Sequence, residues 1–182
     1  MTKAERTQTE EDFMFKLKQS VEGSLREVYI ESIGSFSMEE DMPQKSLLII
    51  GAGGIGTTVV DLLVPALARI ALGAKMTLMD GDTVEASNLG HQNYSRADIG
   101  KFKVDALAEK WSKAEGLQVH SVPENLRHLE QLDDFDLVVV CVDRPEPRRL
   151  VHSLDVPWLD LRGGGDGSVM LLSLILIGRC RP

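Results

Sequence analysis

Cysteine is scarce in this chain, because its 182 residues include only Cys141 and Cys180, which lie far apart. Two separated cysteines argue against a disulfide framework and against a cysteine-rich zinc site, and they suit a reducing compartment. An excess of positive charge is lacking as well. The formal net charge is -8 at pH 7, which argues against a general nucleic-acid-binding surface. We therefore expect a cytoplasmic protein that has no nucleic-acid partner.

Long apolar segments are also lacking. The longest apolar run, over residues 169–177, is too short to cross a bilayer as a helix, and the polar N-terminus does not resemble a signal peptide. We expect no membrane partner. Hydrophobic residues nevertheless make up 43% of the chain, which is ordinary for a folded protein, and the length suffices for one domain with a core.

Residues 1–45 are predicted to form an N-terminal helical extension and a connector. Apolar residues recur at a spacing of three to four between Phe13 and Val28, which is typical of an amphipathic helix. Residues 34–43 are acidic and rich in turn-forming residues. Residues 46–182 are then predicted to form the main domain.

From residue 46 the pattern alternates between strand-like and helix-like segments. Pro65 lies inside the first expected helix and is predicted to kink or interrupt it. Strands are expected at 47–50, 76–79, 118–121, 137–141, 156–160 and 169–177, and helices at 55–72, 101–113 and 144–153. This alternation predicts an α/β, Rossmann-like, doubly wound fold with a mostly parallel sheet and helices on both faces.

A glycine-rich turn follows the first predicted strand. Gly51, Gly53 and Gly56 fit G-x-G-x-x-G, a turn that holds phosphate between a strand and a helix. The first glycine allows the tight turn, the second lets a pyrophosphate approach the backbone, and the third lets the helix pack close to its strand. The helix N-terminus adds free N–H groups and a partial positive charge. Because Thr57-Thr58 follow without the lysine of a Walker loop, any cation must come from elsewhere.

Asp80 ends the second predicted strand, where an acidic side chain can accept hydrogen bonds from ribose hydroxyls. The same carboxylate could instead order the loop that follows it. From the glycines and Asp80 alone, NAD and ATP are equally good candidate ligands.

The loop after Asp80 distinguishes these ligands. It reads D-G-D-T-V-E-A-S-N-L-G-H-Q over residues 80–92, and D-I-G-K-F-K follows over residues 98–103. Together with the glycine turn, this order resembles the adenylating domain of the E1-like superfamily, which includes the ThiF/MoeB group and the ubiquitin-activating enzymes. The family pattern there is GxGGxG, then D-x-D-x-V-x-x-S-N-L-x-R-Q, then G-x-x-K, and later T-D-N. The resemblance extends over about residues 46–177.

Most positions of this pattern have a counterpart here. Asp143 stands where T-D-N usually stands, and Arg148 falls where the family often has an arginine. The other matching positions are Gly51, Gly53, Gly54, Gly56, Asp80, Asp82, Val84, Ser87, Asn88, Leu89, Gln92 and Lys103.

The resemblance implies a function for residues 46–182 as a nucleotide-binding E1-like adenylation domain. Its reaction would be ATP-dependent adenylation of the C-terminal carboxylate of a ubiquitin-like or sulfur-carrier protein that ends in Gly-Gly. ATP and Mg²⁺ would be the cofactors, and a homodimer the assembly. A Mg²⁺ ion and cationic side chains suit this chemistry, because the incoming carboxylate and the triphosphate repel each other.

The resemblance also implies roles for individual residues. Asp80 would bind ribose, Asn88 and Lys103 would contact the phosphates, and Asp143 would bind Mg²⁺. Lys103, Asn88 and His91 are the predicted catalytic residues. The predicted cofactor-binding residues are Gly51, Gly53, Gly54, Gly56, Asp80, Asp82, Asn88, Gln92, Lys103 and Arg148.

Several of these residues also have a purely structural interpretation. Lys103 could be a solvated surface charge, and Asp143 could cap the following helix. Asp82 could order its loop through backbone hydrogen bonds. Cys141, at the end of an apolar strand, is predicted to be a small core residue rather than a nucleophile, and Lys101 is predicted to face solvent.

The chain departs from the family pattern at two positions and at its end. His91 stands where the family has an arginine, so His91 has a weaker role, or Arg96 or Lys101 substitutes, or turnover is impaired. Arg144 replaces the asparagine of T-D-N. The domain is expected to be incomplete at the C-terminus, because the family segment with the thioester or persulfide cysteine and the zinc-binding cysteine pairs would follow Pro182. We therefore expect no thioester transfer and no zinc in this chain.

Two alternatives stay open. The first is a degenerate E1-like homologue that binds nucleotide or a partner protein without turnover. The second is an NAD-dependent oxidoreductase, which only the glycine turn and Asp80 support.

Overall fold

The computed structural model describes residues 44–70 and 74–164, together with the backbone of residues 167–173. These ranges belong to one unit of the chain, residues 44–182. The predicted helix between Phe13 and Val28 lies outside the described residues, as does Cys180, so the N-terminal extension stays a prediction.

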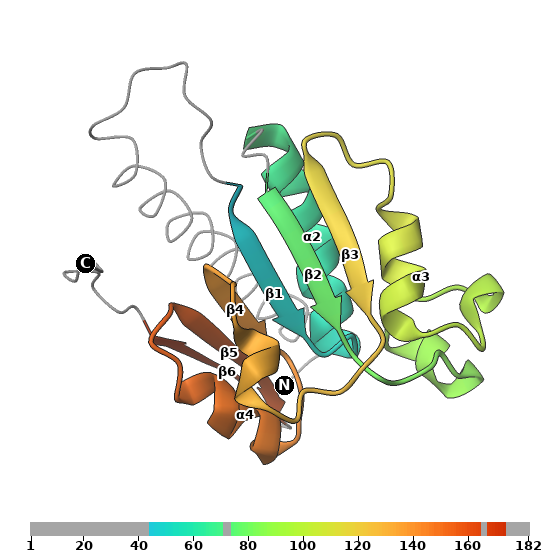
Figure 1. The fold of residues 1–182 in the computed structure, drawn as a ribbon. Helices are drawn as coiled ribbons and strands as arrows, with labels where there is room; N and C mark the ends of the chain where they lie inside the picture. Colours follow the sequence, from blue (N-terminus) through green and yellow to red (C-terminus); the bar gives the residue numbers. More distant parts are fainter. Residues whose placement is uncertain (1–43, 71–73, 165–166, 174–182) are drawn as a thin grey trace. The chain divides into compact units, whose positions relative to one another are not determined.

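A six-stranded sheet in the order β3-β2-β1-β4-β5-β6 organises this unit (Figure 1). Neighbouring strands from β3 to β5 run parallel, and β6 pairs with β5 in the antiparallel direction. The predicted Rossmann-like, mostly parallel sheet is therefore confirmed. The strands are β1 (Ser46–Ile50), β2 (Ala74–Met79), β3 (Leu117–Val122), β4 (Leu137–Val140), β5 (Trp158–Gly164) and β6 (Gly167–Ser173).

The central strands β1 and β4 form the core of the sheet. Their register pairs Leu48 with Val138 and Ile50 with Val140, and all four side chains are buried. Unbroken apolar runs of this kind are typical of parallel strands that are covered on both faces. Because the parallel strands point the same way, the residues that follow β1, β2 and β4 meet at one edge of the sheet.

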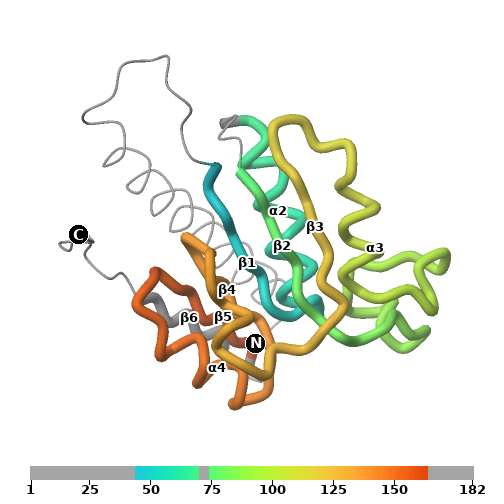
Figure 2. The backbone as a smooth tube through the Cα atoms, viewed as in Figure 1, coloured from blue at the N-terminus to red at the C-terminus, as the bar shows by residue number. Residues whose placement is uncertain are grey.

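Three described helices cover the sheet: α2 (Gly54–Ile70), α3 (Lys103–Lys110) and α4 (Pro145–His152). α2 and α4 lie on opposite faces of the sheet, as the tube in Figure 2 also shows. α2 continues through Pro65 to Ile70, so the expected interruption does not occur. The residues on either side of Pro65 are buried, and we attribute the continuity to packing, which outweighs the lost backbone hydrogen bond.

α3 begins two residues later than its pattern predicts. The Val84 amide donates to the carbonyl oxygen of Lys101, and the Lys103 amide donates to that of Asp82. Both donor–acceptor distances are 2.9 Å. These bonds hold residues 101 and 102 against the loop after β2, so the helix starts at Lys103. Among residues 44–70 and 74–164, no helix combines the length and the apolar character that crossing a bilayer requires.

Candidate functional site

A cleft of about 950 Å³ lies at the edge of the sheet where β1, β2, β4 and β5 end. This volume falls within the range of roughly 300–1,000 Å³ that is usual for small-molecule sites. Of the predicted site residues, Gly56, Asn88 and His91 do not line the cleft. The predicted residues that do line it are Gly51, Gly53, Gly54, Asp80, Asp82, Gln92, Lys103, Asp143 and Arg148.

The glycine turn has the geometry that its sequence predicts. Gly51 has a φ of 97°, which favours glycine. A Cβ atom on Gly56 would lie 1.9 Å from the Gly51 carbonyl oxygen, so this glycine permits close contact between α2 and the end of β1. A Cβ on Gly53 would meet nothing within 4 Å, and Gly53 lines the cleft. The backbone at Gly53 is therefore open to a ligand.

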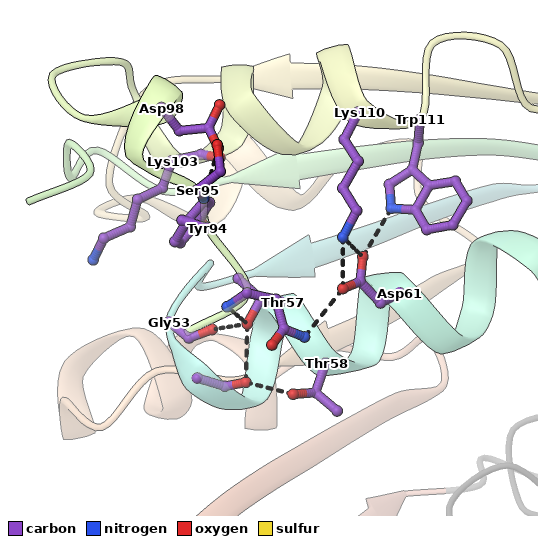
Figure 3. Close-up of polar contacts among 12 residues, drawn as sticks. Gly53, Thr57, Thr58, Asp61, Tyr94, Ser95, Asp98, Lys103, Lys110 and Trp111 are labelled. Atoms are coloured by element: carbon purple, nitrogen blue, oxygen red, sulfur yellow. Dashed lines mark hydrogen bonds and ion pairs between the residues drawn. The ribbon is translucent and has the colours of Figure 1, made fainter. Parts of the chain in front are cut away.

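The two threonines after this turn bond to the helix itself (Figure 3). The Thr57 hydroxyl donates to the carbonyl oxygens of Gly53 at 2.9 Å and Gly54 at 3.1 Å, and the Thr58 hydroxyl donates to that of Gly54 at 2.8 Å. Because a hydroxyl has one hydrogen, Thr57 shares it between two acceptors. These threonines stabilise the first turn of α2, and neither lines the cleft.

Asp80 joins the glycine turn to the following loop. Its Oδ2 accepts a hydrogen bond from the Ala52 amide at 2.6 Å, and its Oδ1 accepts one from the Asp82 amide at 2.9 Å. Asp80 therefore orders the loop, as its structural interpretation predicts, and it also lines the cleft. Each carboxylate oxygen has a second lone pair, which leaves acceptor capacity for a ligand.

Lys103 is a buried charge at the start of α3. Only 7% of the residue is exposed, so the interpretation of Lys103 as a solvated surface charge is wrong. Its Nζ lies 3.1 Å from Asp82 Oδ2, which gives the ammonium group a partner on the wall of the cleft. By contrast, Lys101 is partly exposed and forms an ion pair with Glu109 at 2.6 Å, as expected for a solvent-facing side chain.

Two residues that the sequence did not single out hold the loop before Lys103. The buried Tyr94 hydroxyl donates to the Ala52 carbonyl oxygen at 2.7 Å, and burial raises the pKa of Tyr94 well above its usual value. Asp61 on α2 accepts hydrogen bonds from Asn93, Lys110 and Trp111, at distances between 2.7 and 3.0 Å (Figure 3). The loop is thus attached to both the glycine turn and α2.

Asn88 and His91 lie elsewhere in this loop. Asn88 Oδ1 accepts a hydrogen bond from the Glu85 amide at 2.8 Å, within the short helix η1 (Ala86–Gly90). His91 is exposed. Their predicted phosphate and catalytic roles stay predictions. Gln92 does line the cleft, and its buried Oε1 has no hydrogen-bond partner among the described residues. A buried acceptor of this kind needs a partner, which a ligand could supply.

Asp143 follows β4 and is exposed at the cleft. The N-cap position of α4 is Arg144, with Pro145 inside the first turn, so Asp143 does not cap this helix. Within residues 44–70 and 74–164, no group of three or more potential metal ligands is present. Mg²⁺ is commonly held by one or two carboxylates together with substrate phosphates, a mode that Asp143 fits. The preceding Cys141 is buried, and burial raises its thiol pKa to about 12, which agrees with a core role.

A buried carboxylate organises the far side of the cleft. Asp160 on β5 is 0% exposed and forms ion pairs with Arg148 and, at 2.6 Å, with Arg162. The His152 Nε2 atom lies 2.9 Å from the same carboxylate. Arg148 also donates to the Val142 carbonyl oxygen. Asp160 and Arg162 were not among the predicted site residues, although an aspartate inside an apolar strand is itself a signal, because a buried charge needs partners.

Cationic side chains are numerous at the cleft. They can attract an anionic ligand. Arg127 and Arg162 correspond to no position of the family pattern, so they were not predicted to lie here. The cationic residues that line the cleft are Lys103, Arg127, Arg144, Arg148 and Arg162.

Known proteins share this sequence pattern and fold. Residues 26–172 match the ThiF family. The adenylyltransferase and sulfurtransferase uba4 of Pyricularia oryzae is 34% identical over 140 residues, which cover 72% of this chain and 26% of that relative. The structure of E. coli MccB with MccA-N7isoASN has a TM-score of 0.60 at 25% identity, over 71% of this chain and 40% of that chain.

A second solved structure supports the fold. E. coli tRNA N6-threonylcarbamoyladenosine dehydratase, TcdA, in complex with ATP has a TM-score of 0.55 at 22% identity, over 64% of this chain and 50% of that chain. This chain thus spans about a quarter of the length of uba4 and half or less of the two solved structures.

Proposed function

The chain belongs to the ThiF family, and on that premise we propose that it supplies the nucleotide-binding part of an enzyme that adenylates a carboxylate with ATP. The observation that carries this proposal is the convergence of an open glycine turn, Asp80 and Lys103 on one cleft. A nicotinamide-dependent oxidoreductase is disfavoured, because the matches from Asp82 to Lys103 belong to the ThiF pattern and a dinucleotide site does not require them.

The residues of the cleft fit a nucleoside triphosphate. Gly53 leaves space for a phosphate against the backbone, at the N-terminus of α2. Asp80 retains acceptor capacity for ribose hydroxyls, and the orphaned Gln92 Oε1 requires a donor. Threonines follow the glycine turn where a Walker loop has a lysine, and Lys103 would supply the missing cation. E. coli MccB and TcdA, which share the fold, have both been solved with ATP.

The proposed reaction needs positioning and charge neutralisation more than it needs proton transfer. A carboxylate oxygen of the substrate forms a bond to the α-phosphorus of ATP. The bond between that phosphorus and the bridging oxygen breaks, and the electron pair leaves with pyrophosphate. Lys103 would stabilise the negative charge that develops on the phosphate oxygens. When bound, Mg²⁺ would neutralise phosphate charge, and Asp143 would be its protein ligand.

We propose a protein substrate, the C-terminal carboxylate of a ubiquitin-like or sulfur-carrier protein that ends in Gly-Gly. The support is the ThiF family match and the name of the uba4 relative, an adenylyltransferase and sulfurtransferase. A homodimer and a cytoplasmic location complete the proposal. They rest on the family resemblance and on the scarcity of cysteine.

A degenerate homologue is the competing function, because exposed His91 does not line the cleft. ATP–pyrophosphate exchange with the purified chain and a candidate carrier protein separates the two. If the chain adenylates the carrier protein, exchange should depend on that carrier and should be lost when the terminal Gly-Gly of the carrier is removed. Binding of MgATP without exchange would identify the degenerate homologue. A melting temperature that NAD raises and MgATP does not would contradict both.

A further inference from the structure

Arg162 lies close to the glycine turn, although 106 residues or more separate the two in sequence. The next residue on β5, Gly163, is so placed that a Cβ atom there would lie 3.4 Å from Cδ1 of Ile55. Ile55 belongs to the first turn of α2. The end of β5 therefore contacts the N-terminus of α2, and Arg162 lines the same cleft as Gly53.

Asp160 holds the Arg162 guanidinium by one edge. The Nε and Nη2 atoms of Arg162 donate to the same Asp160 oxygen, Oδ2, at 3.1 and 2.6 Å. Nη1 has no hydrogen-bond partner within residues 44–70 and 74–164, and the side chain is 40% exposed. Arginine carries five N–H donors in a planar fork, so donors remain available for an anion.

Asp160 is shared between two arginines. One carboxylate faces two guanidinium groups, since Arg148 contacts Oδ1 while Arg162 contacts Oδ2. Arg148 is largely buried, with 9% of its side chain exposed. Arg162 is the more exposed of the two guanidinium groups. An anion entering the cleft would be attracted to Arg162.

We propose that Arg162 contacts the phosphates of the bound nucleotide and supplies a cation that the family pattern assigns to the position of His91. This inference rests on the proposed function for its ligand. Asp160 acts as the positioning residue, because it fixes the guanidinium edge that faces away from the ligand. Arg162 would thereby compensate for the histidine at position 91, and the cleft would need no arginine there.

The test compares Arg162→Gln with Arg149→Gln in the full chain, by calorimetric titration with MgATP, inorganic tripolyphosphate and adenosine. Arg149 is a matched control, because it is an exposed arginine of α4 that does not line the cleft. We expect Arg162→Gln to weaken MgATP and tripolyphosphate binding by about tenfold or more, the loss typical of a hydrogen bond to a charged group. Adenosine binding should be unchanged, and Arg149→Gln should bind all three ligands normally.

The adenosine titration also reports on folding, since a misfolded variant would lose all three ligands. Arg162→Lys keeps the charge without the fork and should retain part of the affinity. Unchanged MgATP affinity in Arg162→Gln would overturn the proposal, and so would equal losses for MgATP and adenosine. If Arg162→Gln impaired binding of a Gly-Gly peptide while MgATP binding was intact, Arg162 would contact the carboxylate instead. The wild-type chain could bind tripolyphosphate but not ATP, and Arg162→Gln could lose the tripolyphosphate. That outcome would contradict only the proposed function.

Discussion

The Tyr94 hydroxyl donates a 2.7 Å hydrogen bond to the carbonyl oxygen of Ala52, which lies within the glycine turn. This bond joins the loop after β2 to the turn that would hold phosphate. Its removal should therefore affect both folding and ligand binding.

Tyr94→Phe removes this bond and leaves the Ala52 carbonyl oxygen without its donor. We expect the free energy of unfolding to fall by about 1–2 kcal/mol, because a buried acceptor loses its partner. MgATP affinity should fall as well, since the turn is less constrained. Urea denaturation and calorimetry measure the two effects, and a variant as stable as the wild type would show that the bond is energetically neutral.

The two glycines at 53 and 56 should respond differently to the same added methyl group. Gly56→Ala should destabilise the fold by about 3 kcal/mol or more, because its Cβ would overlap the Gly51 carbonyl oxygen. Gly53→Ala should remain folded and lose MgATP affinity, because its Cβ enters the open cleft. Gly90→Ala is the control, since its Cβ also meets nothing within 4 Å and Gly90 does not line the cleft. Equal MgATP affinity in Gly53→Ala and Gly90→Ala would argue against a phosphate at Gly53.

Lys103→Ala should lower the rate of ATP–pyrophosphate exchange by about 100-fold, the scale on which loss of a donor to a developing charge acts. The loss of folding stability should be much smaller in proportion, because Asp82 is largely exposed and can be solvated when its partner is removed. Lys101→Ala removes the same charge from a solvent-facing side chain and should change both properties little. Proportional losses of exchange and stability in Lys103→Ala would make Lys103 a structural residue.

Asp80→Ala should weaken MgATP binding by about 1–3 kcal/mol if ribose hydroxyls lose their acceptor. It should also destabilise the loop, because the amides of Ala52 and Asp82 lose theirs. Asp80→Asn retains one oxygen acceptor and should fall between Asp80→Ala and the wild type in both measurements. If Asp80→Ala affected stability alone, ribose binding would be excluded.

Cys141 should be inert towards alkylation in the folded chain. Burial raises its pKa from 9.0 to about 12, so the reactive thiolate is scarce at pH 8. The unfolded state loses this proton near pH 9 and the folded state near pH 12, so stability should fall as the pH rises across that interval. Iodoacetamide labelling of a Cys180→Ser variant, with and without urea, measures the difference. Rapid labelling without urea would contradict burial of the thiol.

The sequence predicted the parts of the fold that local pattern determines. The apolar runs of β1 and β4 and the glycines at 51 and 56 each encode their geometry within a few residues. The cluster around Asp160 was not predictable in this way. It depends on α4 packing beside β5, so no spacing along the chain relates Asp160 to Arg148.

Most of the site residues that the family pattern predicts line the cleft, and a few of them lie outside it. Asn88 belongs to η1, where its side chain bonds to the backbone of Glu85. Ordered spacing in a sequence identifies a shared loop, and it does not determine which side chains of that loop face the ligand. At Pro65 the local sequence was also misleading. A proline costs a helix one backbone hydrogen bond, and the burial of the neighbouring residues against the folded sheet outweighs that loss.

Asp61 and Tyr94 attach the loop after β2 at two separate places, α2 and the glycine turn. A ligand that enters the cleft consequently meets a wall that is already assembled. Little conformational entropy would then be lost on association, and affinity would not be reduced by the cost of ordering this segment. The cleft is preorganised on this side before any nucleotide arrives.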